Sequence, residues 1–257
     1  MIFEQKYSSS KGNLYYVTAS NGRKLLIDPG VSWKRLSECG LTDIEAVICG
    51  HLHKDHSRSL KDVAKAKISV YASRETLESQ ELLRDPNTHV VAGNTLVKLD
   101  SFQVLAFKVC HDCKEPLGYI VREKATNEYL LFAVDTNNIE YDFRKFKFSI
   151  VAIECSYDIK ILQQRLDSGE VNEYYARRLI SSHLEKLMTR TYLSKFCDLS
   201  KCREIHLLHL SDDNIDREAT MAEFEKEFKI KTIICNTKPV KPKTLTDEQL
   251  NKYKATA

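Results

Sequence analysis

Long apolar runs, repeats and low-complexity blocks are all missing from this 257-residue chain, and each absence excludes a class of protein. A membrane-spanning helix needs about 20 apolar residues in a row, and the apolar-rich stretch 148–155 is far shorter. Residues 1–6 show no apolar core of a secretion signal, so we expect a cytoplasmic protein that does not bind a membrane. The missing repeats and biased segments exclude solenoid and low-complexity architectures.

The chain also lacks a strong charge of either sign. Its formal net charge is only +3, from 39 basic and 36 acidic residues, which neither requires nor excludes a nucleic-acid partner. Its eight cysteines are scattered without the spacing of a small secreted domain, so we expect reduced thiols, most of them buried as small apolar residues. With 42% hydrophobic and 29% charged residues, the composition fits a compact α/β protein.

Period-two alternation predicts strands, and helix-period apolar positions predict helices. The predicted strands are residues 13–20, 23–28, 46–49, 67–71, 96–110, 117–122, 129–134 and 231–235. The predicted helices are residues 59–66, 73–83, 171–196 and 217–228. Turn signals at Asn21-Gly22 and around Asn127 join several strands as hairpins. Strands followed by helices, twice along the chain, predict a layered α/β fold with two helix-covered sheets.

We expect a single domain over residues 1–237, because no internal boundary is visible. Residues 238–257 contain several lysines and prolines, which predicts a surface extension with one helical turn near 246–253. The sequence leaves the oligomeric state open, with a homodimer as one option.

The most informative segment is His51-Leu52-His53-Lys54-Asp55-His56, directly after a predicted strand. Three imidazoles and a carboxylate crowded into one short turn repel and desolvate each other unless a divalent cation neutralises and coordinates them. The alternative is a solvated polar loop. The HxHxDH spacing favours bound metal.

Further candidate ligands follow other predicted strands, where a rigid scaffold can aim them at one point. They are His111, Asp135 and His209. Taken singly, His111 could be a hydrogen-bonded loop residue, Asp135 a turn former and His209 a capping residue. Together with the HxHxDH turn they make five histidines and two aspartates, more than one tetrahedral zinc needs, and match a two-metal site with a bridging carboxylate.

These motifs resemble those of the metallo-β-lactamase-fold hydrolases, over most of the chain. Asp28, in Leu25-Leu26-Ile27-Asp28-Pro29-Gly30, is similar to the aspartate that supports the metal loop in that family. The resemblance implies a four-layer αββα sandwich with the site at the edge where both sheets meet. It also implies two divalent metal ions, zinc or manganese, bridged by Asp135. The implied ligands are His51, His53 and His111 for one ion, and Asp55, His56 and His209 for the other.

Finer features resemble the YycJ/WalJ-type branch, a group of small bacterial and phage proteins generally regarded as nucleases. They are Ser8-Ser9-Ser10-Lys11-Gly12-Asn13, Glu154-Cys155-Ser156-Tyr157-Asp158, Ser182-His183-Leu184 and His209-Leu210-Ser211. The resemblance implies a binuclear metal-dependent phosphodiesterase acting on DNA or RNA. Two alternatives stay open: a phosphodiesterase for a small substrate such as a cyclic nucleotide, and a catalytically weak metal-binding regulatory module.

Four residues receive roles beyond metal binding. Asp55 can orient the attacking water as well as bind metal. His183, which the resemblance places near the site, is the candidate proton donor to the leaving oxygen, or else a structural histidine on the predicted helix 171–196. Ser211 and Asn214 could hydrogen-bond a substrate, or cap the helix that starts near Arg217.

Other polar features favour ordinary structural roles. We expect no redox role for Cys110 and Cys113, because His111 between them is better explained as a ligand. On a strand His206 faces away from His209, so we expect it to be packed, and we expect His89 in a loop. The basic runs Arg144-Lys145-Phe146-Lys147 and Arg177-Arg178 could line a phosphate backbone, but such runs are more often solvated faces.

Overall fold

The computed structural model describes residues 1–235. The expected extension 238–257, with its helical turn near 246–253, lies outside the described residues, as do residues 236 and 237 of the expected domain.

No helix in the described part of the chain is both long enough and apolar enough to cross a membrane. All eight cysteines are free thiols, four of them buried and four half-buried.

The first half of the chain forms a six-stranded sheet in the order β1-β2-β3-β4-β5-β6. β1 to β3 are antiparallel, and β3 to β6 are parallel. The strands are β1 (Ile2–Ser9), β2 (Gly12–Thr18), β3 (Lys24–Ile27), β4 (Ile44–Cys49), β5 (Val70–Ala72) and β6 (Thr88–Val90). The helices are α1 (Trp33–Cys39), α2 (Lys54–Ser57), α3 (Leu60–Lys65) and α4 (Arg74–Ser79).

The second half forms a seven-stranded sheet in the order β15-β14-β12-β10-β9-β8-β7. Its strands are β7 (Leu96–Lys98), β8 (Phe102–Lys108), β9 (Leu117–Glu123), β10 (Tyr129–Ala133), β12 (Ile150–Glu154), β14 (Glu204–Leu208) and β15 (Lys231–Ile234). β10, β12, β14 and β15 run parallel. A separate pair joins β11 (Phe143–Lys147) to β13 (Cys197–Asp198). The helices are α5 (Ile159–Asp167), α6 (Glu173–Ser182), α7 (Lys186–Phe196) and α8 (Arg217–Phe228).

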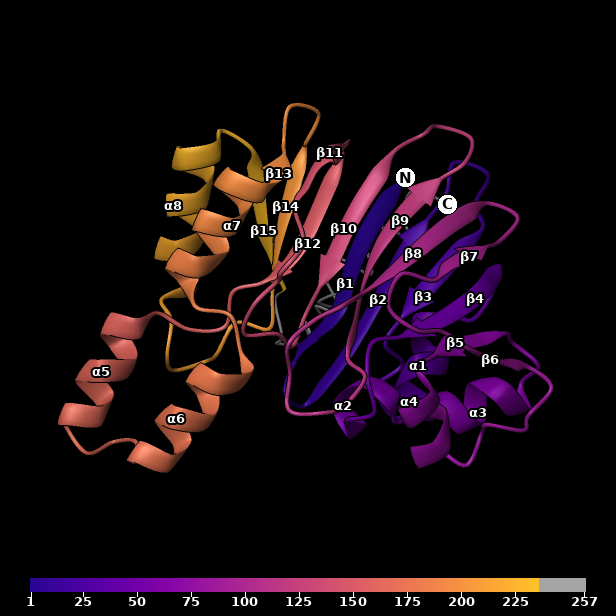
Figure 1. Ribbon diagram of the computed structural model, residues 1–257, viewed down its shortest axis with the longest axis horizontal. Coiled ribbons are helices and arrows are strands. Elements are labelled where there is room, and N and C mark those ends of the chain that lie inside the picture. The colour runs from indigo at the N-terminus through magenta and orange to yellow at the C-terminus, as the bar shows by residue number, and fades with distance from the viewer. Residues whose placement is uncertain (236–257) are drawn as a thin grey trace, which may run out of the picture.

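The two sheets face each other and are covered by helices on their outer faces (Figure 1). Each sheet has two apolar faces because side chains alternate along its strands. In β3, Leu25 and Ile27 pack between the sheets, while Leu26 packs under the helices of the first half. Phe132 joins the core between the sheets, while its neighbour Leu131 packs with Phe224 of α8. The expected four-layer αββα sandwich is confirmed.

Three expectations about local structure are wrong. Residues 96–110 form a hairpin rather than one strand, because the chain turns at Asp100-Ser101 and the Leu99 amide donates to Phe102. The expected helix 171–196 breaks at His183, and Glu185 accepts hydrogen bonds from the amides of Leu187 and Met188 to start α7. His89 lies in β6 and stacks on Tyr71, with ring centroids 4.6 Å apart.

Candidate metal centre

The candidate ligands follow strands of both sheets, and their side chains come within reach of one another. Asp28 follows β3, Asp135 follows β10 and His209 follows β14. All three have a positive φ, of 56°, 51° and 54° respectively. A non-glycine residue in this region costs about 1 kcal/mol or more, and such strain clusters at functional sites. The turn after each of these strands therefore directs a polar side chain towards the shared cluster of candidate ligands.

Asp28 fixes the loop that carries the HxHxDH motif. One carboxylate oxygen accepts the Gly50 amide at 2.7 Å, and the other lies 2.8 Å from His56 Nδ1. The loop also passes very close to Gly30, where a Cβ atom would lie 1.6 Å from the Asp55 carbonyl oxygen. Glycine at position 30 is thus required for the loop to reach its place. These contacts are the ones through which the predicted supporting role of Asp28 would act.

A first group of side chains converges around His51, His53, His111 and Asp135. His53 Nδ1 lies 3.0 Å from His51 Nε2 and 3.2 Å from His111 Nε2. Asp135 Oδ2 lies 3.5 Å from His51 Nε2 and 3.6 Å from His111 Nε2. His111 Nδ1 donates to the Ser182 carbonyl at 2.9 Å, which leaves its Nε2 lone pair directed at the group. Three ring nitrogens and a carboxylate can hold a divalent cation.

A second group consists of Asp55, His56, Asp135 and His209. His56 Nε2 lies 3.0 Å from Asp135 Oδ2 and 3.6 Å from Asp55 Oδ2. His209 Nε2 lies 3.4 Å from the other oxygen, Asp135 Oδ1. Asp135 is the member that the two groups share. A carboxylate shared by two ligand groups can bridge two cations.

The polar atoms of the site fit a metal because some of them are otherwise unsatisfied. Asp135 Oδ1 and His209 Nε2 are buried and have no hydrogen-bond partner among the described residues. An orphaned buried polar atom costs about 1–3 kcal/mol, more if charged, so its presence calls for an explanation. A coordinated cation provides one for both atoms.

Charge is distributed unevenly among these side chains. Burial lowers the pKa of His51 and of His111. Burial also opposes charge on His56, but Asp135 and Asp28 outweigh it and raise the pKa of His56 well above its usual range. For Asp135, burial acts to raise the pKa, but His209 and His56 outweigh burial and hold this pKa well below its usual range. Without a cation, the buried aspartates depend on histidine for compensation.

His183 and Glu154 extend the site on one side. His183 Nδ1 lies 2.6 Å from Glu154 Oε1 and 3.7 Å from Asp135 Oδ1. Its ring stacks on His209, with centroids 5.1 Å apart. Burial lowers the pKa of His183, but the Glu154 carboxylate outweighs burial and raises it to about 9. Asp135, Glu154, His183 and His209 form a third group that could hold a cation, so His183 lies within reach of the candidate ligands.

Sequence reasoning assigned no role to two carboxylates of the site. Glu154 is completely buried, and its second oxygen accepts the Thr136 amide at 2.7 Å, beside Asp135. Its signal was an acidic residue at the end of the apolar strand β12. Asp112 Oδ1 lies 3.0 Å from His111 Nε2 and 3.5 Å from His53 Nε2. Asp112 is partly exposed, at the open side of the first group.

Ser211 and Asn214 do not cap the following helix, so that interpretation is wrong: Asp216 caps α8 through the Ala219 amide. Asn214 is fully buried, accepts from Arg165 at 2.7 Å and donates to the Tyr175 hydroxyl at 2.9 Å. Ser211 Oγ accepts the backbone and side-chain amides of Asn214. The two residues therefore tie the α5–α6 pair to the loop after β14. Their contact with a substrate stays a prediction.

His206 is packed, as predicted, and lies apart from the ligand groups. It is buried, its ring meets Phe3 edge-on at 4.8 Å, and its Nδ1 lies 2.9 Å from the Gln5 amide nitrogen. Cys110 and Cys113 are both free thiols. Burial raises the pKa of each thiol, to about 12 for Cys113, which is the opposite of a reactive redox cysteine.

Comparison with known proteins identifies the family of this chain. A family model described as "Beta-lactamase superfamily domain" matches residues 23–165, more than half of the chain. No curated protein sequence matches. The metallo-β-lactamase fold protein YhfI from Bacillus subtilis is similar in structure, with a TM-score of 0.67 at 16% identity, over 91% of this chain and 96% of that one.

Two further solved structures share the fold. Zn(2+)-bound PqqB from Methylobacterium extorquens has a TM-score of 0.64 at 12% identity, over 87% of this chain and 84% of that one. The short form of human tRNase Z has a TM-score of 0.59 at 16% identity, over 91% and 96%. The chain thus belongs to the beta-lactamase superfamily and has the metallo-β-lactamase fold, which supports a hydrolase with a His/Asp cluster able to hold metal.

Proposed function

We propose that the protein is a binuclear metal-dependent phosphodiesterase that acts on DNA or RNA. The observation that carries the proposal is the pair of ligand groups that share the buried Asp135. His51, His53 and His111 would hold one ion, and Asp55, His56 and His209 the other. Zinc and manganese both suit imidazole and carboxylate ligands. Two such ions would lower the pKa of a bound water and polarise a phosphoryl oxygen.

We assign His183 to the leaving oxygen. The Glu154 carboxylate at 2.6 Å keeps a proton on His183 Nδ1 and holds the ring against His209. Nε2 of His183 then remains for the substrate, and can donate a proton to an oxygen that leaves with negative charge. Glu154 acts through His183 and is a positioning residue. We assign Asp55, partly exposed beside His56, to orienting the attacking water.

A polynucleotide substrate is favoured by the resemblance to the YycJ/WalJ-type nucleases and by the fold shared with human tRNase Z. Arg178 is exposed on α6, five residues before His183, and so lies on a helix whose end enters the site. Arg177 is exposed too, but pairs with Glu173 at 2.9 Å. Arg178 is therefore the better candidate for a backbone phosphate contact.

A substrate screen tests the proposal. The protein loaded with zinc or manganese is assayed on single-stranded DNA, duplex DNA, RNA and cyclic nucleotides, with Asp135→Ala as the control. We expect hydrolysis of a polynucleotide and a log–log salt slope of nearly one for each phosphate contact. Preference for a cyclic nucleotide with a flat salt dependence would favour the small-substrate alternative. No turnover of any substrate by protein holding two ions would favour the regulatory module.

A further inference from the structure

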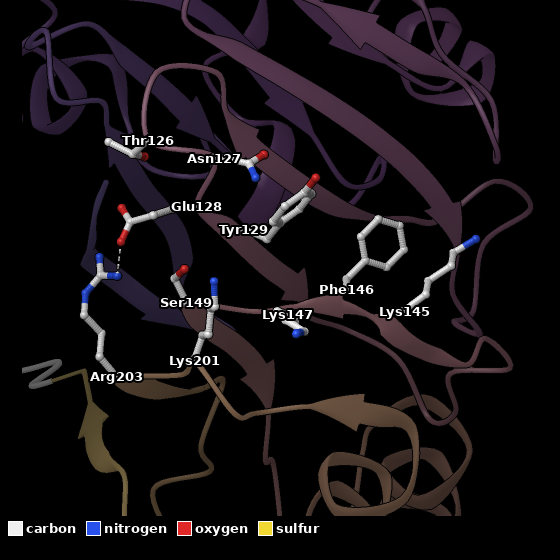
Figure 2. A pocket seen from close by; sticks show the side chains of 10 residues that line it. All are labelled: Thr126, Asn127, Glu128, Tyr129, Lys145, Phe146, Lys147, Ser149, Lys201 and Arg203. Atoms are coloured by element: carbon white, nitrogen blue, oxygen red, sulfur yellow. Dashed lines mark hydrogen bonds and ion pairs between the residues drawn. The ribbon is translucent and has the colours of Figure 1, made fainter.

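A pocket lies at the opposite ends of the strands that carry the candidate metal ligands. β10 starts at Tyr129 and leads towards Asp135, β12 starts directly after Ser149 and ends at Glu154, and β14 starts directly after Arg203. Since a strand rises about 3.3 Å per residue, roughly 15–20 Å separate the two ends. The pocket has a volume of about 850 Å³. Figure 2 shows the residues that line it: Thr126, Asn127, Glu128, Tyr129, Lys145, Phe146, Lys147, Ser149, Lys201 and Arg203.

The lining of this pocket has an excess of positive charge. Four of its side chains are basic and only Glu128 is acidic. Glu128 is already bonded to Arg203, and to the amino group of Met1. Lys145, Lys147 and Lys201 are exposed, and no ion pair within residues 1–235 involves any of them. The excess charge of the pocket is thus available to an anion.

One acidic group, Asp198, lies near these lysines. Asp198 is the partner of Lys147 in the β11–β13 pair. The carboxylate of Asp198 accepts the Ser200 amide at 2.9 Å and forms no ion pair with Lys147, so it offsets part of the positive charge and leaves the pocket with a net excess. In Figure 2 the side chains of Lys147 and Lys201 lie between Arg203 and the aromatic rings, while the Lys145 ammonium extends outward.

Two aromatic rings form one wall of the pocket. The rings of Tyr129 and Phe146 have centroids 5.7 Å apart at an angle of 54°. The Arg122 guanidinium lies 6.0 Å from the Tyr129 ring, and is itself held by Asn127 at 2.7 Å. Tyr129 therefore has a charged planar partner, whereas the planar partner of Phe146 is the buried Phe148, with centroids 6.0 Å apart at 26°. Phe146 is half-buried, and its only cationic neighbour in the described part of the chain is the flexible, exposed Lys145, 5.4 Å from the ring centroid. Phe146 is the better stacking platform.

We propose that this pocket binds a nucleotide unit, with its base stacked on Phe146 and its phosphate held by Lys147 and Lys201. A simple anion would use only the lysines, and a neutral planar molecule only the ring, whereas a nucleotide uses both. Stacking on aromatic side chains beside a basic groove is how proteins bind single-stranded nucleic acid. The volume also lies within the range of about 300–1,000 Å³ that small-molecule sites occupy.

The nucleotide unit can belong to a single strand or be free, and the experiment separates these sources. Binding of a labelled single-stranded oligonucleotide and of adenosine monophosphate is measured on the metal-loaded protein and on Lys147→Glu/Lys201→Glu. Lys34→Glu/Lys65→Glu is the matched control: Lys34 is exposed on α1 and Lys65 on α3, both next to the other sheet. This control changes the net charge of the protein by the same amount. Amide hydrogen exchange with and without ligand locates the binding.

We expect the Lys147/Lys201 variant to bind about tenfold or more weakly, with a salt slope smaller by about 0.7 for each phosphate that the lysines no longer bind. The control should bind as the parent does. Ligand should protect residues 126–129 and 143–149 from exchange. Affinity for the oligonucleotide alone identifies a strand, and affinity for the monophosphate as well identifies a free nucleotide. Equally weakened binding in both variants, or no protection of these residues, would overturn the proposal.

Phe146→Leu tests the stacking separately. Leucine keeps an apolar side chain against Phe143 and Phe148, so the fold should be retained, which the melting temperature checks. Loss of base stacking should weaken binding about 5- to 100-fold. If Phe146→Leu binds like the parent while pyrophosphate competes fully, the pocket is an anion site and the nucleotide assignment fails. Binding is read here without turnover, so this test stands even if the metal centre does not hydrolyse phosphodiesters.

Discussion

The same parallel strands end in two very different places. At their carboxyl ends, Asp135, Glu154 and His209 are buried and converge within a few ångströms. Near their amino ends, Lys147 of β11 and Lys201 are exposed and take part in no ion pair in the described part of the chain. One end buries its polar groups and leaves two polar atoms without a hydrogen bond, and the other exposes positive charge around the half-buried ring of Phe146.

The contrast between the two ends indicates what each can do. Rigid, desolvated ligands suit a cation and bond-making chemistry, because electrostatic effects are strongest away from water. Long lysine side chains suit a ligand that must be held without fixed geometry, since they act as point charges on flexible stems. Substitutions at the metal end should therefore act on metal and turnover, with effects that decrease as the substituted residue lies farther from the ions.

Asp135→Ala should have the largest effect. We expect metal content to fall from about two ions per chain to below one. Hydrolysis should fall by about 10³-fold or more, since a catalytic cation supplies several kcal/mol of transition-state stabilisation. His209→Ala should chiefly empty the group with Asp55 and His56. Elemental analysis of the purified proteins decides; full metal loading of Asp135→Ala would contradict the shared carboxylate.

His183→Ala should keep both metals and lower turnover about 10²- to 10⁴-fold on a substrate with a poor leaving group. A p-nitrophenyl phosphodiester needs no proton on its leaving oxygen and should be hydrolysed nearly as well as by the parent. Glu154→Gln should give a smaller loss with the same dependence on the leaving group. If His183→Ala loses metal instead, His183 is a ligand of the third group.

Asp28→Asn should weaken metal binding about 10- to 100-fold, the usual cost of removing a carboxylate that orients a ligating histidine. The reason is the 2.8 Å contact of Asp28 with His56 Nδ1. Competition with a metal chelator measures the affinity. Asp142→Asn is a matched control, because Asp142 pairs with Arg144 on the surface. An affinity unchanged in Asp28→Asn would show that Asp28 only shapes the loop.

His206, midway along β14, should affect stability but not chemistry. Burial lowers the pKa of His206 from 6.5 to about 4. Between these two pKa values His206 is protonated in the unfolded chain but neutral in the folded protein. The free energy of unfolding therefore decreases as the pH falls from 6.5 towards 4, by about 3 kcal/mol at most. His206→Gln should flatten this part of the pH dependence, measured by urea unfolding. An unchanged slope would place the acid sensitivity elsewhere.

The local part of the metal site could be predicted from the order of residues alone. The HxHxDH turn carries four candidate ligands in six residues, and Asp28, His111, Asp135 and His209 each follow an apolar strand, so both features can be read along the chain. α8 was predicted with its observed bounds because its helical signal is uninterrupted. β1 was not predicted, because its polar residues obscure the alternation that identifies a strand. Its extended conformation depends on pairing with β2.

Which distant groups meet depends instead on the packing of the whole fold. Glu154 reaches His183 across 29 positions, and that contact coincides with the break in the expected helix 171–196. The basic pocket joins residues 126–129, 145–149 and 201–203, whose separate charge runs look like ordinary solvated surface. The order of apolar and polar residues within a segment indicates which of its faces is buried. It contains no information on which segments the sheets bring together, because strand order is set by packing over the whole core.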